Sequence, residues 1–218
     1  MAAKNSQDNP QKKISLHEAV LDGNKDMVDY LITNGSDVNK KNHTGSSPLH
    51  FAAGCCHVEI LKFLIENGAS VDAKDMYGVT PLHDAAELGH VEVLKCLIEN
   101  GALIDAKNNT YGDTPLHFAA QHNQFEVLKC LIENGANVSE KNDYGYTPLD
   151  IATERGHQDV VNYLTEIMME KKKAENEKIP EENSSLSLLG EFGQVWARLS
   201  QFRRVWASLV QIWTSLEP

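Results

Sequence analysis

The sequence predicts an all-α solenoid of stacked helix pairs, followed by a separate amphipathic helix near the C-terminus. Two motifs that recur at one common period predict the solenoid. A tetrapeptide of Thr or Ser, Pro, Leu and then His or Asp returns at separations of 33, 34 and 33 residues, and a segment of the type LKCLIENGA keeps step with it. Such a period is typical of units that bury their apolar faces by stacking on their neighbours. The tetrapeptides start at residues 47, 80, 114 and 147, and the longer motif spans 61–69, 94–102 and 128–136.

A short first helix opens each unit. Thr or Ser supplies a hydroxyl that can cap the helix, and Pro at the first helical position gives up an N–H that would have no partner there. The apolar residues of this helix, such as Leu82, Ala85 and Ala86, are small on one side, which lets a second helix approach closely. Gly or Asn then ends the helix, because these residues tolerate the left-handed backbone region. Cys56 stands where the other units have Gly or Asn, so we expect the helix end there to be strained or differently wound.

A second helix carries one apolar stripe. In the central unit Val91, Leu94, Leu97 and Ile98 follow one another at three- and four-residue spacing before a stop at Asn-Gly. A polar, extended stretch with Gly at its turn follows, as in residues 72–78, and we expect it to project as a finger. One unit cannot bury its stripe alone, so neighbouring units are expected to stack.

The unit resembles the ankyrin repeat in its TPLHxAA, GH and LLxxGA-type signatures, which recur in register from about residue 15 to residue 168. The resemblance implies helix-turn-helix repeats with projecting β-turn fingers. The first unit lacks the Thr-Pro and the turn, as expected of a terminal cap, and the third has one extra residue near 108–110, which lengthens its finger. The expected ankyrin-repeat domain, 14–168, comprises an N-terminal half-repeat (about 14–41), three full repeats (about 42–74, 75–107 and 109–141) and a C-terminal capping repeat (about 142–168).

The remaining segments fall outside the repeat pattern. We expect residues 1–13 to be disordered, 169–186 to be a charged helix extension and linker, and 187–217 to form a Trp-rich amphipathic helix. Two apolar series with sevenfold spacing, offset by three residues, predict this last helix. The series are Phe192, Leu199, Trp206 and Trp213, and Val195, Phe202, Leu209 and Leu216. The residues expected to make its contacts are Trp196, Phe202, Trp206, Leu209 and Trp213.

The apolar stripe of that helix could pack against any of three surfaces: the C-terminal end of the solenoid, another helix, or a membrane. Folding back or helix pairing is favoured over membrane binding, because residues 185–218 carry only three Arg against two Glu. Three Arg within the segment disfavour a transmembrane span. A liposome flotation assay that compares residues 1–184 with the full chain distinguishes these alternatives.

Charge and composition limit the classes of partner. The net charge is −11, and residues 1–184 carry 17 Lys and Arg against 29 Asp and Glu, so the body repels a phosphate backbone and no nucleic acid is expected. No stretch has the length and apolar character of a signal peptide or a membrane span. We therefore expect a cytoplasmic location, with the nucleus as the alternative, and four free thiols.

The histidines and cysteines are explained mainly by the repeat. Seven of the nine histidines fall into two columns of equivalent positions, and the resemblance implies that the first column ties neighbouring repeats together. Columns of this kind lie about 10 Å apart in stacked helices, whereas zinc ligands lie about 2 Å from the ion, so no metal site is expected. Cys96 and Cys130 share a column with Tyr30, Phe63 and Tyr163 and are predicted to be core residues. No catalytic motif is present, so we expect no enzyme activity and no cofactor.

The predicted function is a protein-interaction scaffold or adaptor that binds another protein on its concave surface, meaning the finger tips and the outward face of each first helix. Tyr77, Tyr111 and Tyr144 each precede a turn Gly in one column. Tyrosine is enriched at interfaces because it buries a large area with few rotatable bonds, although a Tyr before Gly can also be simple turn filler. The alternative function is a membrane-associated regulator anchored by the C-terminal helix. The expected partner-binding residues are Met76, Tyr77, Val79, Asp84, Leu88, Tyr111, Asp113, Phe118, His122, Tyr144 and Tyr146.

Overall fold

The computed structural model describes residues 14–177, which form helices joined by turns and loops, without a strand. The chain divides into two units, Met1–Met168 and Met169–Pro218, and the repeat array lies in the first. The expected disordered N-terminus, the linker beyond residue 177 and the Trp-rich helix with its contact residues lie outside the described residues.

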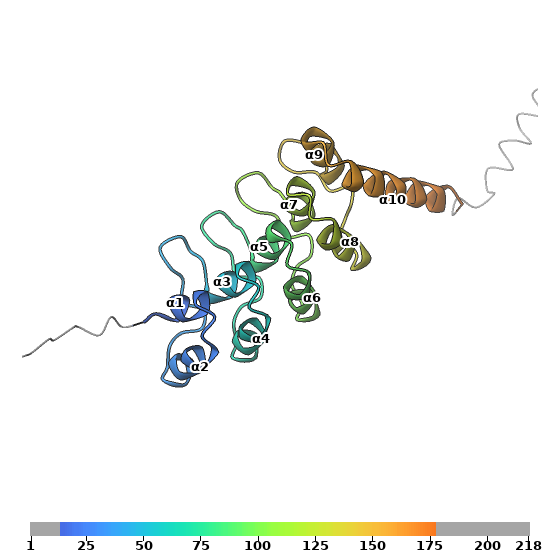
Figure 1. Ribbon diagram of the computed structural model, residues 1–218. Coiled ribbons are helices and arrows are strands. Elements are labelled where there is room, and N and C mark those ends of the chain that lie inside the picture. Colours follow the sequence, from blue (N-terminus) through green and yellow to red (C-terminus); the bar gives the residue numbers. More distant parts are fainter. Residues whose placement is uncertain (1–13, 178–218) are drawn as a thin grey trace, which may run out of the picture. The chain divides into compact units, whose positions relative to one another are not determined.

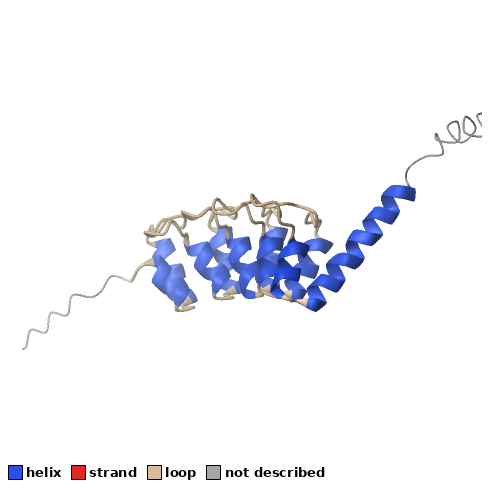
Figure 2. Ribbon diagram, turned by 90° about the horizontal axis from the view of Figure 1, so that it is seen from above, coloured by secondary structure: helices blue, strands red, loops and turns tan. Residues whose placement is uncertain are grey.

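The helices of the array form two rows (Figure 1). The first helices of the repeats, α1, α3, α5, α7 and α9, pack on one another in sequence order, and α2, α4, α6 and α8 line up beside them. The long loops between repeats gather along one edge of the array in Figure 2. The helices are α1 (Leu16–Leu21), α2 (Lys25–Thr33), α3 (Pro48–Gly54), α4 (Val58–Glu66), α5 (Pro81–Leu88), α6 (Val91–Glu99), α7 (Pro115–Gln121), α8 (Phe125–Glu133), α9 (Pro148–Arg155) and α10 (Gln158–Glu177).

The starts of the first helices follow the sequence rules. Pro81 is the first residue of α5, and Thr80 before it has an extended backbone, which is the conformation of an N-cap. The third helical residue, His83, reaches back and accepts the backbone N–H of Thr80 at 3.2 Å, so the histidine takes the place that Glu or Gln occupies in the usual capping box. The same arrangement recurs at Ser47 with His50 and at Thr114 with His117.

The ends of the first helices confirm the expected left-handed stops. Gly89 and Gly156 cap α5 and α9 with φ values of 80° and 75°. The residues at the equivalent positions after α3 and α7 are Cys56 and Asn123, which both have a φ of 58°. Left-handed backbone is disfavoured for a residue with a Cβ, so the predicted strain at Cys56 is confirmed.

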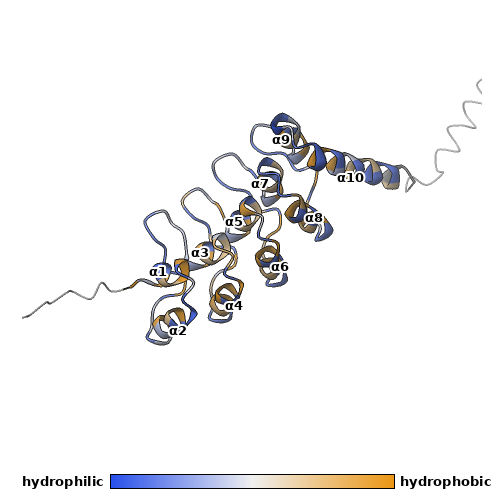
Figure 3. Cartoon of the chain, viewed as in Figure 1, coloured by the Kyte–Doolittle hydropathy of each residue, from blue (hydrophilic) through white to orange (hydrophobic). Residues whose placement is uncertain are grey.

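The core lies between the two rows of helices. Leu82, Ala85 and Ala86 on α5 are fully buried, as predicted, together with Leu94 and Leu97 on α6. In Figure 3 the apolar colour concentrates where helices face one another, and the loops are mostly hydrophilic. The described interior is therefore a continuous apolar layer that runs through the stacked repeats.

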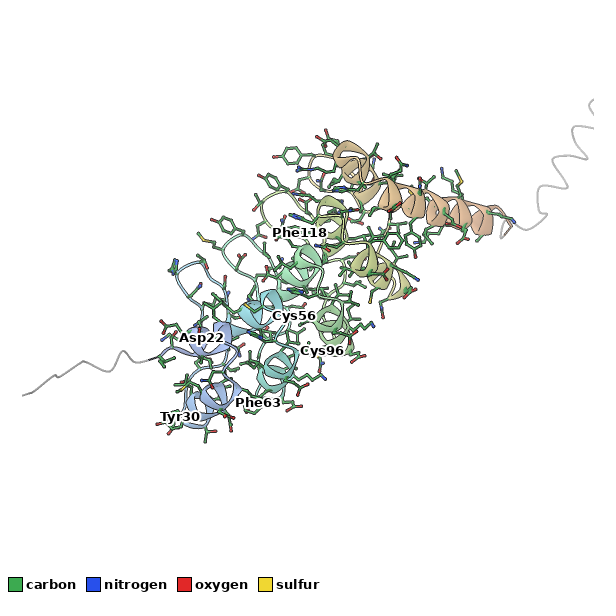
Figure 4. The ribbon with its side chains drawn as sticks, in the orientation of Figure 1. Asp22, Tyr30, Cys56, Phe63, Cys96 and Phe118 are labelled. Atoms are coloured by element: carbon green, nitrogen blue, oxygen red, sulfur yellow. The ribbon has the colours of Figure 1, made fainter. Side chains whose placement is uncertain are left out.

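The prediction that Cys96 and Cys130 are core residues is confirmed. Cys96 and Cys130 are buried, but Tyr30, which occupies the same position on α2, is 62% exposed. This column faces the preceding repeat, as the edge-on contact of Tyr163 with Phe125 at 5.4 Å shows. Because α2 belongs to the first repeat, no described helix pair covers Tyr30. Figure 4 labels Tyr30 at this end of the array.

Candidate functional site

An Asn or Asp side chain orders each finger. The Oδ1 atom of Asp75 accepts the backbone N–H groups of Tyr77 at 2.9 Å and Val79 at 2.8 Å. One carboxylate oxygen thus folds the tip, as Asx turns do. The sequence reasoning missed these residues, although an Asn or Asp recurs in register with the Thr-Pro motif. The equivalent residues in the other fingers are Asn42, Asn108 and Asn142.

Successive fingers are joined by backbone hydrogen bonds at their tips. The carbonyl of Tyr77 accepts the N–H of Asn109 at 2.7 Å, and the carbonyl of Tyr111 accepts the N–H of Asp143 at 2.8 Å. Gly78, which follows Tyr77, permits this approach, since a Cβ on it would lie 2.7 Å from the backbone nitrogen of Asn109. The backbone on which the tyrosines are mounted is therefore held in place.

A lysine ladder runs along the same fingers. The ammonium group of Lys74 donates to the carbonyl of Lys107 at 3.0 Å, and Lys107 donates to the carbonyl of Lys141 at 2.8 Å. Lys41 opens the ladder with a bond of 2.7 Å to the carbonyl of Lys74. Each finger is thus linked to the next through a side chain as well as through its tip.

The extra residue of the third finger is accommodated at its tip. In the other fingers the Asn or Asp oxygen accepts the N–H of the second residue after it, but Asn108 accepts the N–H of the third, Tyr111, at 3.1 Å. The predicted lengthening of this finger is confirmed. The longer loop keeps Tyr111 in the same column, because the finger retains its tip bond from Asn109 to Tyr77 and Tyr111 retains the bond from Asp143.

Exposed aromatic and apolar side chains line the finger tips. Tyr144 is 68% exposed and Tyr111 is 49% exposed, and their rings contact each other in a tilted pair with centroids 5.8 Å apart. Tyrosine rings that remain this exposed on an ordered backbone present a large contact area to a partner. The exposed members of the predicted site are Met76, Tyr77, Leu88, Tyr111, His122, Tyr144 and Tyr146.

The first helices contribute a second part of the surface. Leu88 at the end of α5 is exposed, and Phe118 on α7 is half-buried because its ring packs edge-on against His83. Figure 4 labels Phe118 on the side of the array from which the fingers project. His122 lies beside Glu87, with Nε2 3.8 Å from the carboxylate, so the two can pair when the imidazole is protonated. Val79 is half-buried as well, which leaves it a smaller share of the surface.

Asp84 is an acid in an apolar setting. It is half-buried on α5 and has neither an ion pair nor a side-chain hydrogen bond with another residue in the described range 14–177. Burial raises its pKa to about 8, and the negative charges of Asp75 and Glu87 act in the same direction. A pKa raised in this way favours the protonated form of the carboxyl group.

The placement of Asp113 at the binding surface is wrong. Its side chain is buried, with 6% exposed, and its Oδ1 accepts the amide N–H of Asn142 at 2.8 Å. Its backbone carbonyl accepts Nε2–H of His83 at 3.1 Å. Asp113 therefore joins the third finger to the fourth and supports the surface from beneath.

The first column of histidines ties each repeat to the next, as the resemblance implied. Nε2 of His50 donates to the carbonyl of Val79 at 3.0 Å, and Nε2 of His117 donates to that of Tyr146 at 3.1 Å. Burial lowers the pKa of these histidines, and it lowers that of His83 to about 4, so the rings are neutral at pH 7. These histidines are structural groups beneath the fingers.

The second column links each second helix to the preceding repeat. Nε2 of His90 donates to the carbonyl of Gly54 at 3.1 Å, and that of His157 donates to Gln121 at 3.0 Å. Gln124 takes the histidine position in the third full repeat, and its amide donates to the carbonyl of Glu87 at 2.9 Å.

In residues 14–177 no group of three or more His, Cys, Asp and Glu side chains is arranged to hold a metal ion. Among the helices of residues 14–177, none combines the length and the hydropathy of a membrane span.

Comparison with known families identifies the repeat. A family model described as ankyrin repeats in three copies matches residues 16–108 and 102–176. The chain belongs to the ankyrin-repeat family. Ankyrin repeats are protein-interaction units, so the family implies that this ankyrin array binds another protein.

Individual relatives match shorter parts of the ankyrin array. Protein phosphatase 1 regulatory subunit 27 of Mus musculus is 44% identical over 43 residues, which is 20% of this chain and 28% of that protein. Notch-regulated ankyrin repeat-containing protein A of Danio rerio is 39% identical over 51 residues, 23% of this chain and 46% of that protein. The human Notch-regulated ankyrin repeat-containing protein has the same identity over the same length, and 45% of it is covered. The chain thus spans less than half of each of these relatives.

Proposed function

We propose that this protein is a non-enzymatic scaffold or adaptor, whose ankyrin array binds a partner protein across its concave surface. The main observation in support of the proposal is the row of exposed tyrosines on fingers that hydrogen bonds join to one another. Tyr77, Tyr111 and Tyr144 occupy equivalent tips, and the tip-to-tip bonds hold their backbones in register. A surface ordered before binding loses little conformational entropy when a partner docks, so more of the contact energy appears as affinity.

The proposed contact surface combines the tips with the first helices. Aromatic and methionine side chains supply most of its apolar area, and Leu88 extends that area onto α5. The half-buried acid Asp84 adds one polar group of unusual character. The proposed contact residues are Met76, Tyr77, Val79, Asp84, Leu88, Tyr111, Phe118, His122, Tyr144 and Tyr146.

The names of these relatives agree with a function that depends on binding. One is named as a regulatory subunit of protein phosphatase 1, and the others as Notch-regulated ankyrin repeat proteins. Neither name describes a reaction that the ankyrin protein itself catalyses. Because these matches cover only short segments, they support the class of function and leave the identity of the partner to experiment.

The test removes the tyrosine row and leaves the fold intact. A partner is first captured with the full chain and purified, and its affinity is then measured for the wild type and for the Tyr77→Ala/Tyr111→Ala/Tyr144→Ala variant. Three interface tyrosines at about 1 kcal/mol or more each predict a loss of affinity of about 100-fold or more.

Tyr30→Ala is the matched control, because Tyr30 is equally exposed but lies on α2, away from the fingers. We expect the control to bind like the wild type. Circular dichroism and the urea midpoint establish that the triple variant is folded. A folded triple variant that keeps the wild-type affinity contradicts the proposal.

A further inference from the structure

A small pocket opens on the concave surface between α3 and α5. Its volume is about 210 Å³, and its lining includes Phe51, Cys55, Asp84 and Leu88. Phe51 and Leu88 supply apolar walls, and Asp84 supplies the carboxyl group. A shallow pocket with apolar walls and one acidic group suits a side chain that has an apolar stem and a cationic end.

Among the repeats that carry the Pro-Leu motif, Asp84 is the one acid at its position. The equivalent residues are Phe51 in the preceding repeat, Phe118 in the following one and Ile151 in the last, whereas the N-terminal half-repeat has Glu18 after the column member His17. Phe51 and Phe118 each pack edge-on against the first-column histidine of the preceding repeat. An aspartate at this position gives up that packing and places a carboxyl group among partly apolar neighbours, which costs stability unless a ligand compensates.

The protein itself offers no cation to this carboxyl group within residues 14–177. The adjacent His50 is fully engaged, because its Nδ1 accepts from Ser47 and its Nε2 donates to Val79, and burial lowers its pKa. The charges that act on Asp84 are acidic, namely those of Asp75 and Glu87. The local potential is therefore negative, which favours a positively charged ligand.

We infer that this pocket receives an arginine or lysine side chain of the bound partner, whose cationic end pairs with the carboxylate of Asp84 while its stem lies against Phe51 and Leu88. This inference rests on the proposed function, because it assigns one residue class of a protein partner to one place on the concave surface. Pairing with a cation ionises the carboxyl group, so binding releases a proton when the free group is protonated. Affinity for a basic peptide should therefore rise with pH up to about the pKa of the free group, near 8.

Other groups near the pocket set the background for this pH dependence. Asp84→Asn keeps all of them, so the pH dependence that remains in that variant measures their contribution. The titratable groups that line the pocket or lie beside it are His50 and Cys55 at α3, Asp75 in the preceding finger, Glu87 on α5 and His122 at the end of α7.

The experiment uses peptides selected from a random 12-residue display library on the immobilised full chain. Peptides whose binding is lost in the triple tyrosine variant are synthesised, and their affinities are measured by fluorescence anisotropy at pH 6.0 and 8.5. Each basic residue is also replaced in turn, arginine by citrulline and lysine by its acetylated form, which removes the charge and keeps the length. Glu87→Gln is the matched control, because it removes a neighbouring charge on the same helix.

We expect one basic residue of these peptides to depend on Asp84. Its neutral analogue and Asp84→Asn should each weaken binding tenfold or more, and the two losses should not add in the double change. Affinity for the wild type should be at least tenfold higher at pH 8.5 than at pH 6.0, and this difference should disappear in Asp84→Asn. Glu87→Gln should change affinity less than threefold.

Three outcomes distinguish failure of this inference from failure of the proposed function. Peptides that need the tyrosines but bind Asp84→Asn as they bind the wild type overturn the pocket inference and leave the proposed function standing. Equal losses in Glu87→Gln and Asp84→Asn also overturn it, since they indicate a diffuse field with no specific pair. If no selected peptide needs the tyrosines, the proposed function itself is overturned, and the pocket inference falls with it.

Discussion

Nε2 of His83 lies 3.1 Å from the backbone carbonyl oxygen of Asp113, which belongs to the next repeat. A carbonyl can only accept, so Nε2 carries the hydrogen and Nδ1 is free to accept the N–H of Thr80 at 3.2 Å. Both ring nitrogens are thus satisfied in a site from which water is excluded. One side chain caps its own helix and attaches that helix to the next finger, which makes the exposed surface depend on the buried column.

Removing this histidine should weaken the whole array. His83→Ala leaves the N–H of Thr80 without a partner, removes one of the two hydrogen bonds to the carbonyl of Asp113, whose bond from Asn108 remains, and opens a cavity, so the free energy of unfolding should fall by about 2–4 kcal/mol. Urea denaturation followed by circular dichroism measures the loss. His122→Ala, an exposed histidine, is the control and should cost less than about 0.5 kcal/mol. Equal effects of the two changes argue against a structural role for the column.

The same histidines should make the fold sensitive to mild acid. The pKa of His83 is about 4 in the folded chain, below its ordinary value of 6.5, and those of His50 and His117 are also lowered. The unfolded chain therefore binds protons first as the pH falls. The free energy of unfolding should be highest above about pH 6.5. It should decline as the pH drops toward 4, by up to about 1.4 kcal/mol per pH unit for each histidine. A flat free energy of unfolding between pH 6.5 and 4.5 in the Asp84→Asn background contradicts this prediction.

Asp84 should act on stability in the opposite direction. Its pKa is raised from 3.8 to about 8, so the folded chain holds a proton that the unfolded chain releases, and stability falls as the pH rises through that range. Asp84→Asn should therefore stabilise the protein by on the order of 1 kcal/mol or more at pH 9 and by close to zero at pH 4. Thermal unfolding at the two pH values measures the difference. Glu87→Gln serves as the control, and a gain for Asp84→Asn that is independent of pH rejects the explanation.

Replacing Cys56, the left-handed residue after α3, by glycine should stabilise the protein. Cys56 has a φ of 58°, so Cys56→Gly removes the clash of its Cβ and should raise the free energy of unfolding by about 1 kcal/mol. Asn123→Gly should gain less, because Asn tolerates this region better. Gly89→Ala is the converse change and should destabilise, since Gly89 has a φ of 80° and a Cβ there would collide with the side-chain amide of Gln124, which is bonded to Glu87. An order of stabilities in which Cys56→Gly lies below the wild type would show that the thiol makes a favourable contact larger than the strain.

Local rules predicted most of the fold. Pro81 begins α5 and Gly156 ends α9 because their backbone preferences act within a few residues, whatever the neighbours are. The burial of Leu82 and Ala85 followed from the period alone, since every repeat must turn the same face toward the next. The tyrosine column was predicted in the same way, because a regular repeat places equivalent residues on one line.

Contacts between repeats determine the burial of individual side chains, which the sequence pattern did not predict. Asp113 occupies the finger position held by Val79 and Tyr146 in its neighbours, and it is buried only because Asn142 lies opposite it. Tyr30 shares a column with Cys96, but its exposure depends on whether another repeat precedes it. In both cases the register is encoded locally, whereas burial and hydrogen bonding depend on side chains about 30 residues away.

The sequence by itself determined the repeat, the helix boundaries, the apolar core and the line of tyrosines, because each of these arises from backbone preference or periodicity. Only the tertiary structure decided which polar residues support the surface and which remain free to bind. The protonation of Asp84 shows why, since its pKa depends on how far burial and the acids at 75 and 87 disfavour its charge. Desolvation and electrostatics arise from the assembled neighbours, and no local pattern of residues specifies them.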